Sequence, residues 1–171
     1  MRNRPRSYAL VSAAVGLLAV GCFVPQHLWP QGDLQAGPPA PAESSAVLLA
    51  SRSSDFKAAL AEEVSRRLEA DSIYVEVVGI DDLDDRDVED YRAVVILNSC
   101  IAWGHDADVS GFLEDHLSRH GRMVVVTTSG DGEWAPDVSV EYDALSAASE
   151  LSEVDRLAEE VAERVRALPE A

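Results

Sequence analysis

The chain has 171 residues, of which 47% are hydrophobic and only 6% aromatic, a length that suits one globular domain plus a shorter segment. It carries 31 Asp and Glu against 14 Lys and Arg, and three of the arginines lie in the first six residues, so the body is more acidic than the net charge of −17 suggests. Such a surface repels phosphate backbones and anionic head groups. The composition therefore argues against nucleic-acid binding and favours cationic partners.

Residues 1–25 have the pattern of an export signal, because an arginine-rich start is followed by the uncharged run Ser7 to Gly21 and then by Cys22. Two outcomes are open. Ala19 to Cys22 resembles a bacterial lipobox, in which case Cys22 is lipidated and becomes the N-terminus. Alternatively, Tyr8 to Pro25 stays uncleaved and crosses the bilayer, for which about 18 apolar residues suffice. Either outcome predicts a body that is extracytoplasmic and anchored to the cell membrane.

Residues 26–45 are rich in Pro, Gly, Ala and Gln, which predicts a flexible linker. From Ala46 to Leu168, apolar runs alternate with stretches of helical periodicity. The runs predict strands at Ala46–Ala50, Ile73–Ile80, Ala93–Leu97, Met123–Thr127 and, more weakly, Val138–Tyr142. The periodic stretches predict helices at Phe56–Leu68, Val109–His120 and Glu153–Leu168. Because three strands are apolar at all or almost all positions, we expect a three-layer α/β domain, with a doubly wound parallel five-stranded sheet covered on both faces.

In such a sheet, ligands bind beyond the carboxyl ends of the strands, where the strand order reverses. This rule selects three loops: Ser51 to Phe56, Asn98 to Asp106, and Thr128 to Pro136.

Four segments of residues 46–168, in the right order, carry a family resemblance. They are the hydroxyl-rich turn Ala50 to Asp55, the strand Tyr91 to Leu97 with the later Trp103-Gly104, the helix residues Phe112 to Glu114, and the glycine-containing Val124 to Gly132. In these segments the chain resembles the flavodoxin-like family. The resemblance implies the strand order 2-1-3-4-5 and one-electron transfer through bound FMN.

By that resemblance, three groups of residues would contact FMN. They are Ser51, Ser53 and Ser54 at the phosphate; Asn98, Ser99, Trp103 and Gly104 beside the ring; and Ser129, Gly130, Asp131 and Gly132 on its other side. Structural explanations compete with each group. The first loop has no glycine and carries Asp55, whose charge Arg52 or Lys57 would offset only in part, so plain helix capping is the favoured explanation there. Trp103 can simply cover the sheet end, and the third loop can be a tight acidic turn.

Other chemistry finds less support in the sequence. Cys100 is expected to be an inert thiol, and no disulfide framework is predicted. His105, His116 and His120 lie close in sequence to Asp106 and Asp108, which a solvated polar face explains as well as a metal site does. A serine hydrolase would lack the Gly-x-Ser-x-Gly motif. Asp143 to Ser149 only faintly resembles a segment that joins FMN covalently in some exported flavoproteins.

Three functions are open. The first is a membrane-tethered extracytoplasmic electron carrier that binds FMN and meets a redox partner. The second is a non-catalytic flavodoxin-like module that has lost FMN and binds an envelope protein or another ligand. The third, a hydrolase or reductase with a substrate of its own, has no supporting motif, so the sequence favours a carrier or binding module over an enzyme.

Overall fold

The computed structural model describes residues 32–40, 46–101, 104–130, 132–133 and 141–168. The predicted export signal, with the lipidation site Cys22, lies outside these residues, as do Trp103 and Asp131. Among the described helices, none combines the length and the apolar character that crossing a bilayer requires. The export signal, its processing and the anchoring therefore stay predictions.

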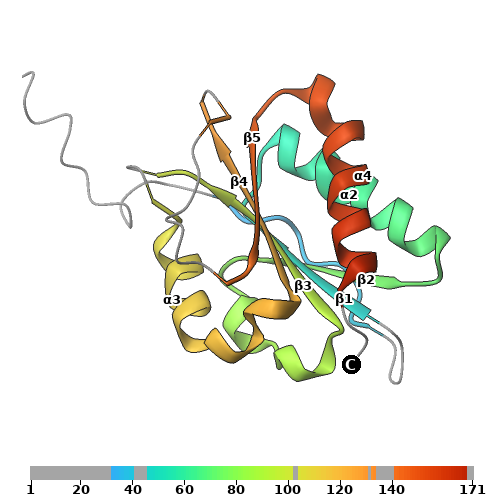
Figure 1. Cartoon of the computed structure of the whole chain (residues 1–171), viewed down its shortest axis with the longest axis vertical. Coiled ribbons are helices and arrows are strands. Elements are labelled where there is room, and N and C mark those ends of the chain that lie inside the picture. Colours follow the sequence, from blue (N-terminus) through green and yellow to red (C-terminus); the bar gives the residue numbers. More distant parts are fainter. Residues whose placement is uncertain (1–31, 41–45, 102–103, 131, 134–140, 169–171) are drawn as a thin grey trace, which may run out of the picture. The chain divides into compact units, whose positions relative to one another are not determined.

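Five parallel strands form one sheet with the order β2-β1-β3-β4-β5 (Figure 1). The strands are β1 (Ala46–Ser51), β2 (Tyr74–Gly79), β3 (Ala93–Ser99), β4 (Met123–Ser129) and β5 (Asp143–Ala148). Both the parallel sheet and the order 2-1-3-4-5 expected from the sequence are confirmed. Because the order reverses between β1 and β3, the loops after these two strands leave toward opposite faces of the sheet.

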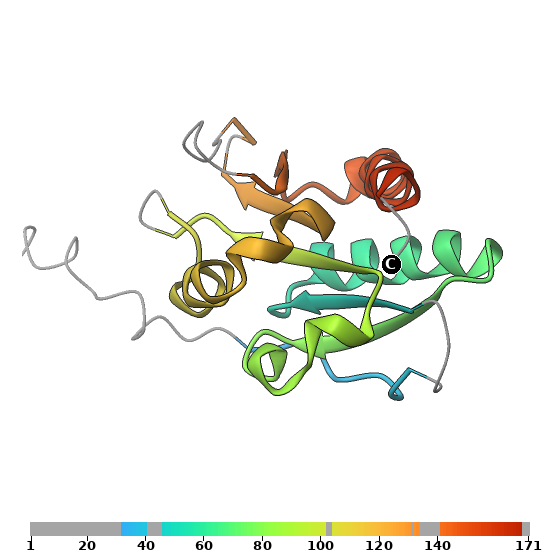
Figure 2. The same ribbon diagram turned by 60° about the horizontal axis from the view of Figure 1, so that its bottom comes forward.

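Helices cover the two faces of the sheet and complete the three layers. On one face, α2 (Asp55–Ala70) lies beside α4 (Val154–Ala167), and α3 (Ala107–Asp115) packs on the other (Figures 1 and 2). Three-residue 3-10 turns at Leu83–Asp85 and Val88–Asp90 bury Leu83 and Val88 on the α3 face.

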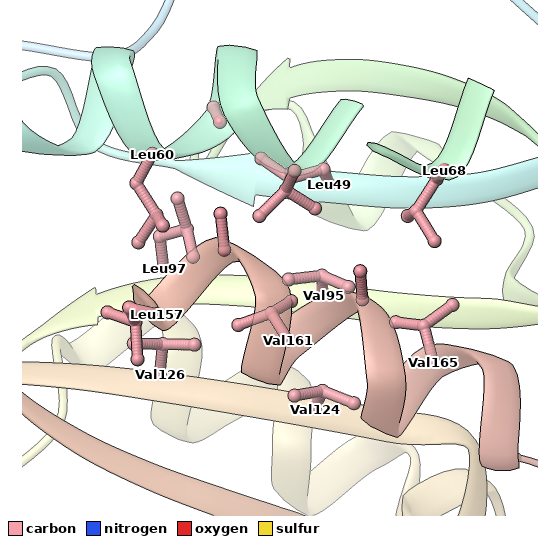
Figure 3. Packing of buried hydrophobic residues seen from close by; sticks show 14 of the residues in the cluster. Leu49, Leu60, Leu68, Val95, Leu97, Val124, Val126, Leu157, Val161 and Val165 are labelled. Carbon is pink, nitrogen blue, oxygen red and sulfur yellow. The ribbon is translucent and has the colours of Figure 1, made fainter. Parts of the chain in front are cut away.

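The side chains of the central strands alternate between the two layers. In β1, Val47 and Leu49 point toward α2 and α4, whereas Leu48 points toward α3, and all three are fully buried. Figure 3 shows the first layer, in which Leu60 and Leu68 of α2 and the valines and leucine of α4 meet the valines of the sheet. A strand buried on both faces favours apolar residues at every position, which is why apolar runs in the sequence predict the central strands.

The fifth strand is not where the sequence predicted it. Propensity favoured Val138–Tyr142, but β5 spans Asp143–Ala148, and Glu141 and Tyr142 precede it outside any strand. The strand consists largely of small residues and lies at an edge of the sheet, where it is only half-buried. It therefore lacks the β-branched residues by which strands are recognised.

The helix predicted at Val109–His120 is also shorter than expected. It begins at Ala107 and ends at Asp115, and a 3-10 segment, Leu117–Arg122, continues the chain. The His120 ring packs edge-on against Tyr142, and its Nε2 lies 2.8 Å from the Leu113 carbonyl oxygen. Packing of this ring holds the segment in place, so His120 serves the α3 layer.

Residues 32–40, the N-terminal strap, lie against the sheet although the sequence placed them in a flexible linker. The Gly37 N–H donates to the Val77 carbonyl of the edge strand β2 at 2.8 Å, and the Ala40 N–H donates to the Glu76 carboxylate at 2.7 Å. Leu34 packs against the α2 and α4 layer. The strap thereby covers an edge whose free backbone groups would otherwise be open to pairing with another chain (Figure 2).

Candidate functional site

The carboxyl ends of β1, β3 and β4 meet at one edge of the sheet, which we call the carboxyl edge. Ser51, Ser99 and Ser129 are the last residues of these strands, and the parallel register places Ser51 beside Leu97 and Ser99 beside Thr128. The three loops that the sequence selected therefore leave the sheet at a common edge.

Arg52, directly after β1, is the centre of the densest charge cluster at this edge. Its side chain is only 9% exposed, yet carboxylates from separate segments reach it. They belong to Asp33 of the strap at 2.9 Å, Asp81 after β2 at 2.5 Å, Asp108 in α3 at 2.5 Å, and Asp106 before α3 at 3.3 Å. The guanidinium offers five N–H donors in a fixed plane, which is what allows one side chain to bind four carboxylates from three segments.

The balance of charge around Arg52 is negative. Burial opposes the charged form, but hydrogen bonds to Asp106, Asp81 and Asp33 outweigh it and raise the pKa of Arg52. The side chains of Asp81 and Asp108 remain 69% and 59% exposed, so their outer oxygens face solvent. The cluster can therefore attract a further cation and repels an anion.

Asn98 organises the loop after β3 from a buried position. Its amide donates to the Thr127 hydroxyl at 3.2 Å, and its side-chain oxygen accepts from the Asp106 N–H at 3.0 Å. The Asp106 carboxylate then caps α3 by accepting from the Asp108 N–H at 3.0 Å. This chain of contacts fixes Asp106 where it meets Arg52.

Lys57 is the only lysine in the chain, and it is buried. It belongs to the first turn of α2, on the inward face that also carries Phe56 and Leu60, and it is 3% exposed. Its Nζ donates to the Ser99 Oγ at 2.6 Å. Burial lowers the pKa of Lys57 to about 8, with a further lowering by Arg52 and an opposing effect from Asp106.

The phosphate loop inferred from the resemblance does not fit a phosphate group. The Ser53 N–H already donates to the Gly32 carbonyl at 2.5 Å, and the Ser51 hydroxyl donates to the Arg52 carbonyl at 2.8 Å. The Ser54 hydroxyl caps α2 by accepting from the Lys57 N–H at 3.2 Å, which agrees with the capping explanation. A phosphate would have to displace the strap from Ser53 and enter among four carboxylates, both of which cost free energy.

The loops expected beside a flavin ring also make contacts within the protein. Gly132 has φ +72°, and a Cβ there would lie 2.5 Å from the Ala148 nitrogen, so this residue forms a tight turn against the end of β5. Gly104 pairs with Ile101 through two backbone hydrogen bonds, and Gly130 has open space where a side chain would be. No contact of Trp103 or Asp131 is described, so their roles stay predictions.

The histidines are engaged by protein groups. The His105 Nε2 lies 3.2 Å from the Tyr142 hydroxyl, and burial lowers the pKa of His105. The His116 Nδ1 lies 2.8 Å from the Phe112 carbonyl oxygen. Within the part of the chain that the structure describes, no three metal-binding side chains come together.

Sequence reasoning named Arg52 and Lys57 only as partial counter-charges and did not select Asp33. One signal was present, because a chain with thirteen arginines uses lysine once, at a position on the inner face of a predicted helix. Asp33 gave no such signal, since nothing in a segment rich in Pro and Gly indicates that it folds back on the sheet.

Comparisons with known proteins bear on the fold. No protein-family profile matches the sequence, and no curated protein matches it. Among solved structures, a flavodoxin from Streptococcus pneumoniae is 16% identical, with 71% of this chain and 97% of that chain covered and a TM-score of 0.50. A flavodiiron core from Synechocystis is 9% identical over 74% of this chain and 36% of that chain, also with a TM-score of 0.50. The domain has a flavodoxin-like fold.

A flavodoxin variant from Pseudomonas aeruginosa is similar as well, at 14% identity over 71% of this chain and 99% of that chain, with a TM-score of 0.48. Similarity at 9 to 16% identity bears on the fold alone, so ligand-binding residues have to be judged one by one.

Proposed function

We propose that this protein is a membrane-tethered, extracytoplasmic binding module, in which a flavodoxin-like domain has lost FMN and instead binds a protein partner with a basic surface. The observation that carries the proposal is the surplus of carboxylates around Arg52, at the place where flavodoxin resemblance would put a phosphate. A negative edge of this kind speeds association with cationic partners and keeps anionic ligands away.

A second acidic surface adjoins the first. Residues 81–90 contain seven acidic side chains, all on exposed residues, while Leu83 and Val88 anchor the segment to the α3 layer. Asp81 belongs to both surfaces, because it also pairs with Arg52. Together they offer a basic partner two groups of carboxylates that share Asp81.

FMN binding with electron transfer is the other candidate, and it is favoured by the shared fold alone. A titration separates the two. The full chain in detergent micelles is added to FMN, and flavin fluorescence and absorbance are followed, with an apoflavodoxin as positive control. We expect no quenching and no spectral shift; stoichiometric quenching would contradict the proposal and support the electron carrier.

Binding to a basic partner is tested with an oligolysine peptide as the probe. We expect salt-sensitive binding that becomes roughly tenfold weaker when Asp81 and Asp108 are both replaced by asparagine, because two exposed charges are lost. Asp155→Asn is the matched control, since the Asp155 side chain is 86% exposed but lies on α4. Equal affinity of all three proteins would count against the carboxyl edge as the binding surface.

A further inference from the structure

Lys57 and Ser99 form an amine–hydroxyl pair at the carboxyl edge. The Nζ–Oγ distance is 2.6 Å, Lys57 is almost fully buried, and Ser99 is half-buried at the end of β3. Every other basic side chain in the described ranges is an arginine or a histidine, so Lys57 carries the one aliphatic amine. The pair stands at the point where the strand order reverses, which is where α/β sheets place their active sites.

The surroundings of Lys57 favour its neutral form. Loss of solvation is the main cause, and it brings the pKa to about 8. Two charged groups act on the amine, Asp106 from the start of α3 and Arg52 from the end of β1, with opposite effects. At neutral pH about a tenth of the molecules then hold an uncharged amine, which can accept a proton from a serine hydroxyl.

We propose that Ser99 is a nucleophile with Lys57 as its general base, and that the pair transfers the acyl group of a carboxylic ester to water. This activity goes beyond partner binding and does not depend on it. In the resting state the ammonium donates to Ser99; once the amine is neutral, the Ser99 hydroxyl donates to Nζ across the same distance. Serine–lysine pairs on unrelated folds use this arrangement.

The steps balance without a cofactor. Ser99 Oγ attacks the ester carbonyl while its proton passes to the Lys57 Nζ. Collapse of the tetrahedral intermediate forms an acyl-serine and breaks the bond to the alcohol, which leaves with the proton from Lys57. Water then attacks the acyl-serine, its proton passing to Lys57 and on to Ser99 Oγ as the carboxylic acid departs. Lys57 lies in the first turn of α2, and the positive end of a helix dipole favours negative charge that develops near it.

The charge of the carboxyl edge defines the substrate class. Asp81 and Asp108 expose carboxylates close to Arg52, so anionic esters, including phosphate esters, are repelled. Neutral or cationic acyl esters are the substrates that this edge admits.

A covalent probe tests the proposal directly. The full chain in detergent micelles is incubated with a fluorophosphonate at pH 7 to 9, and the labelled residue is located by peptide mass spectrometry. We expect one adduct, on Ser99, that is absent in Ser99→Ala and Lys57→Met and retained in Ser65→Ala, where a hydroxyl on α2 bonds only the Ala61 carbonyl. Absence of an adduct on Ser99, or labelling that survives Lys57→Met, would overturn the proposal.

A second measurement keeps the test decisive if Lys57→Met fails to fold. Hydrolysis of p-nitrophenyl acetate by the unaltered protein should rise with pH and reach half its plateau near the pKa of about 8. Because the chain has a single lysine, ¹⁵N-lysine labelling gives one amine signal whose titration reports the same pKa. A rate that is independent of pH across this range, or absent in Ser65→Ala as well as in Ser99→Ala, would contradict a Lys57 base.

Discussion

Arg52 and Lys57 lie five positions apart at the same edge, and the surroundings of the two cations differ sharply. Arg52 is surrounded by four carboxylates from three segments, whereas Lys57 donates to a single neutral hydroxyl. Both side chains are buried. One buried cation is therefore neutralised by the protein, and the other is left to lose its proton.

The difference follows from the chemistry of the two residues. A guanidinium stays charged at any ordinary pH, so burying it requires permanent counter-charges, and its planar donors can satisfy several carboxylates at once. An ammonium is a point charge that responds to burial by shifting its pKa. The structural role at this edge belongs to Arg52, and the capacity to exchange a proton belongs to Lys57.

Arg52→Met removes the neutralised cation and should lower the free energy of unfolding more than any other substitution considered for this edge. The substitution leaves Asp106 and Asp33, which are 10% and 21% exposed, with uncompensated charge. Breaking a buried ion pair on one side costs about 3 to 5 kcal/mol of unfolding free energy. Urea denaturation followed by circular dichroism measures the loss.

Arg156→Met provides the control for that experiment. Arg156 pairs with Glu153 and Glu160, but its side chain is 59% exposed, so we expect a loss of about 1 kcal/mol or less. If Arg52→Met and Arg156→Met lower the unfolding free energy by the same amount, the ion pairs of Arg52 contribute no more to stability than those of an exposed arginine.

The proton exchange of Lys57 should appear as a dependence of stability on pH. The folded pKa lies near 8 and the unfolded value is 10.5, so between them the unfolded chain binds more protons and stability rises with pH. The gain between pH 8 and pH 10 is about 2 kcal/mol. Urea denaturation at half-unit steps of pH measures this slope.

Lys57→Met should flatten the slope, because it removes the group that titrates. The measurements stop at pH 10 because of Tyr91. Burial and the hydrogen bond to Glu76 raise the pKa of Tyr91 to about 12 in the folded protein. Above pH 10 this tyrosine ionises in the unfolded chain first, which lowers the stability as the pH rises and would mask the effect of Lys57. An unchanged slope in Lys57→Met would assign the effect to other groups.

The sheet could be predicted from the sequence because strands that are buried on both faces appear as continuous apolar runs. The run Ala93–Leu97 contains no polar residue, and Met123–Thr127 contains only its last residue, Thr127, whereas a solvated face would require a polar residue at every second position. The edge strand β5 has no such apolar run, since its residues are small and half-buried, and small residues are as common in loops as in such a strand. Prediction therefore failed where burial is partial.

The site was harder to predict for a different reason. The candidate loops were located by topology, which depends only on strand order. Partners such as Asp33 and Arg52, or Lys57 and Ser99, are joined by tertiary contacts between segments with no common pattern. Hydroxyl-rich turns suggested a ligand, while the structure uses the same hydroxyls for capping and for backbone contacts.

Among the changes to the Arg52 cluster, Asp33→Asn should lower the unfolding free energy least. It tests whether the strap contributes to the stability of the domain. The Asp33 carboxylate accepts from the Arg52 Nη1 at 2.9 Å and from the Asp81 N–H at 3.0 Å, and an amide would keep the shape but lose the charge. We expect a loss of about 1 to 2 kcal/mol of unfolding free energy. Asp71→Asn is the control, because Asp71 pairs with Arg166 at an exposed site.

Amide hydrogen exchange, measured in the unaltered protein and in Asp33→Asn, shows whether the strap is docked on the domain or is a flexible tether. The Gly37 and Ser53 amides donate to β2 and to the strap, respectively, so both should exchange faster in Asp33→Asn while the Val95 amide in the central strand β3 stays protected. Rapid exchange of the Gly37 and Ser53 amides in the unaltered protein would mean that the strap is not docked on β2 and on the loop after β1. In that case Arg52 would keep three carboxylates and the Ser53 N–H would be open, so a phosphate at this loop would meet one negative charge fewer and would have no strap to displace.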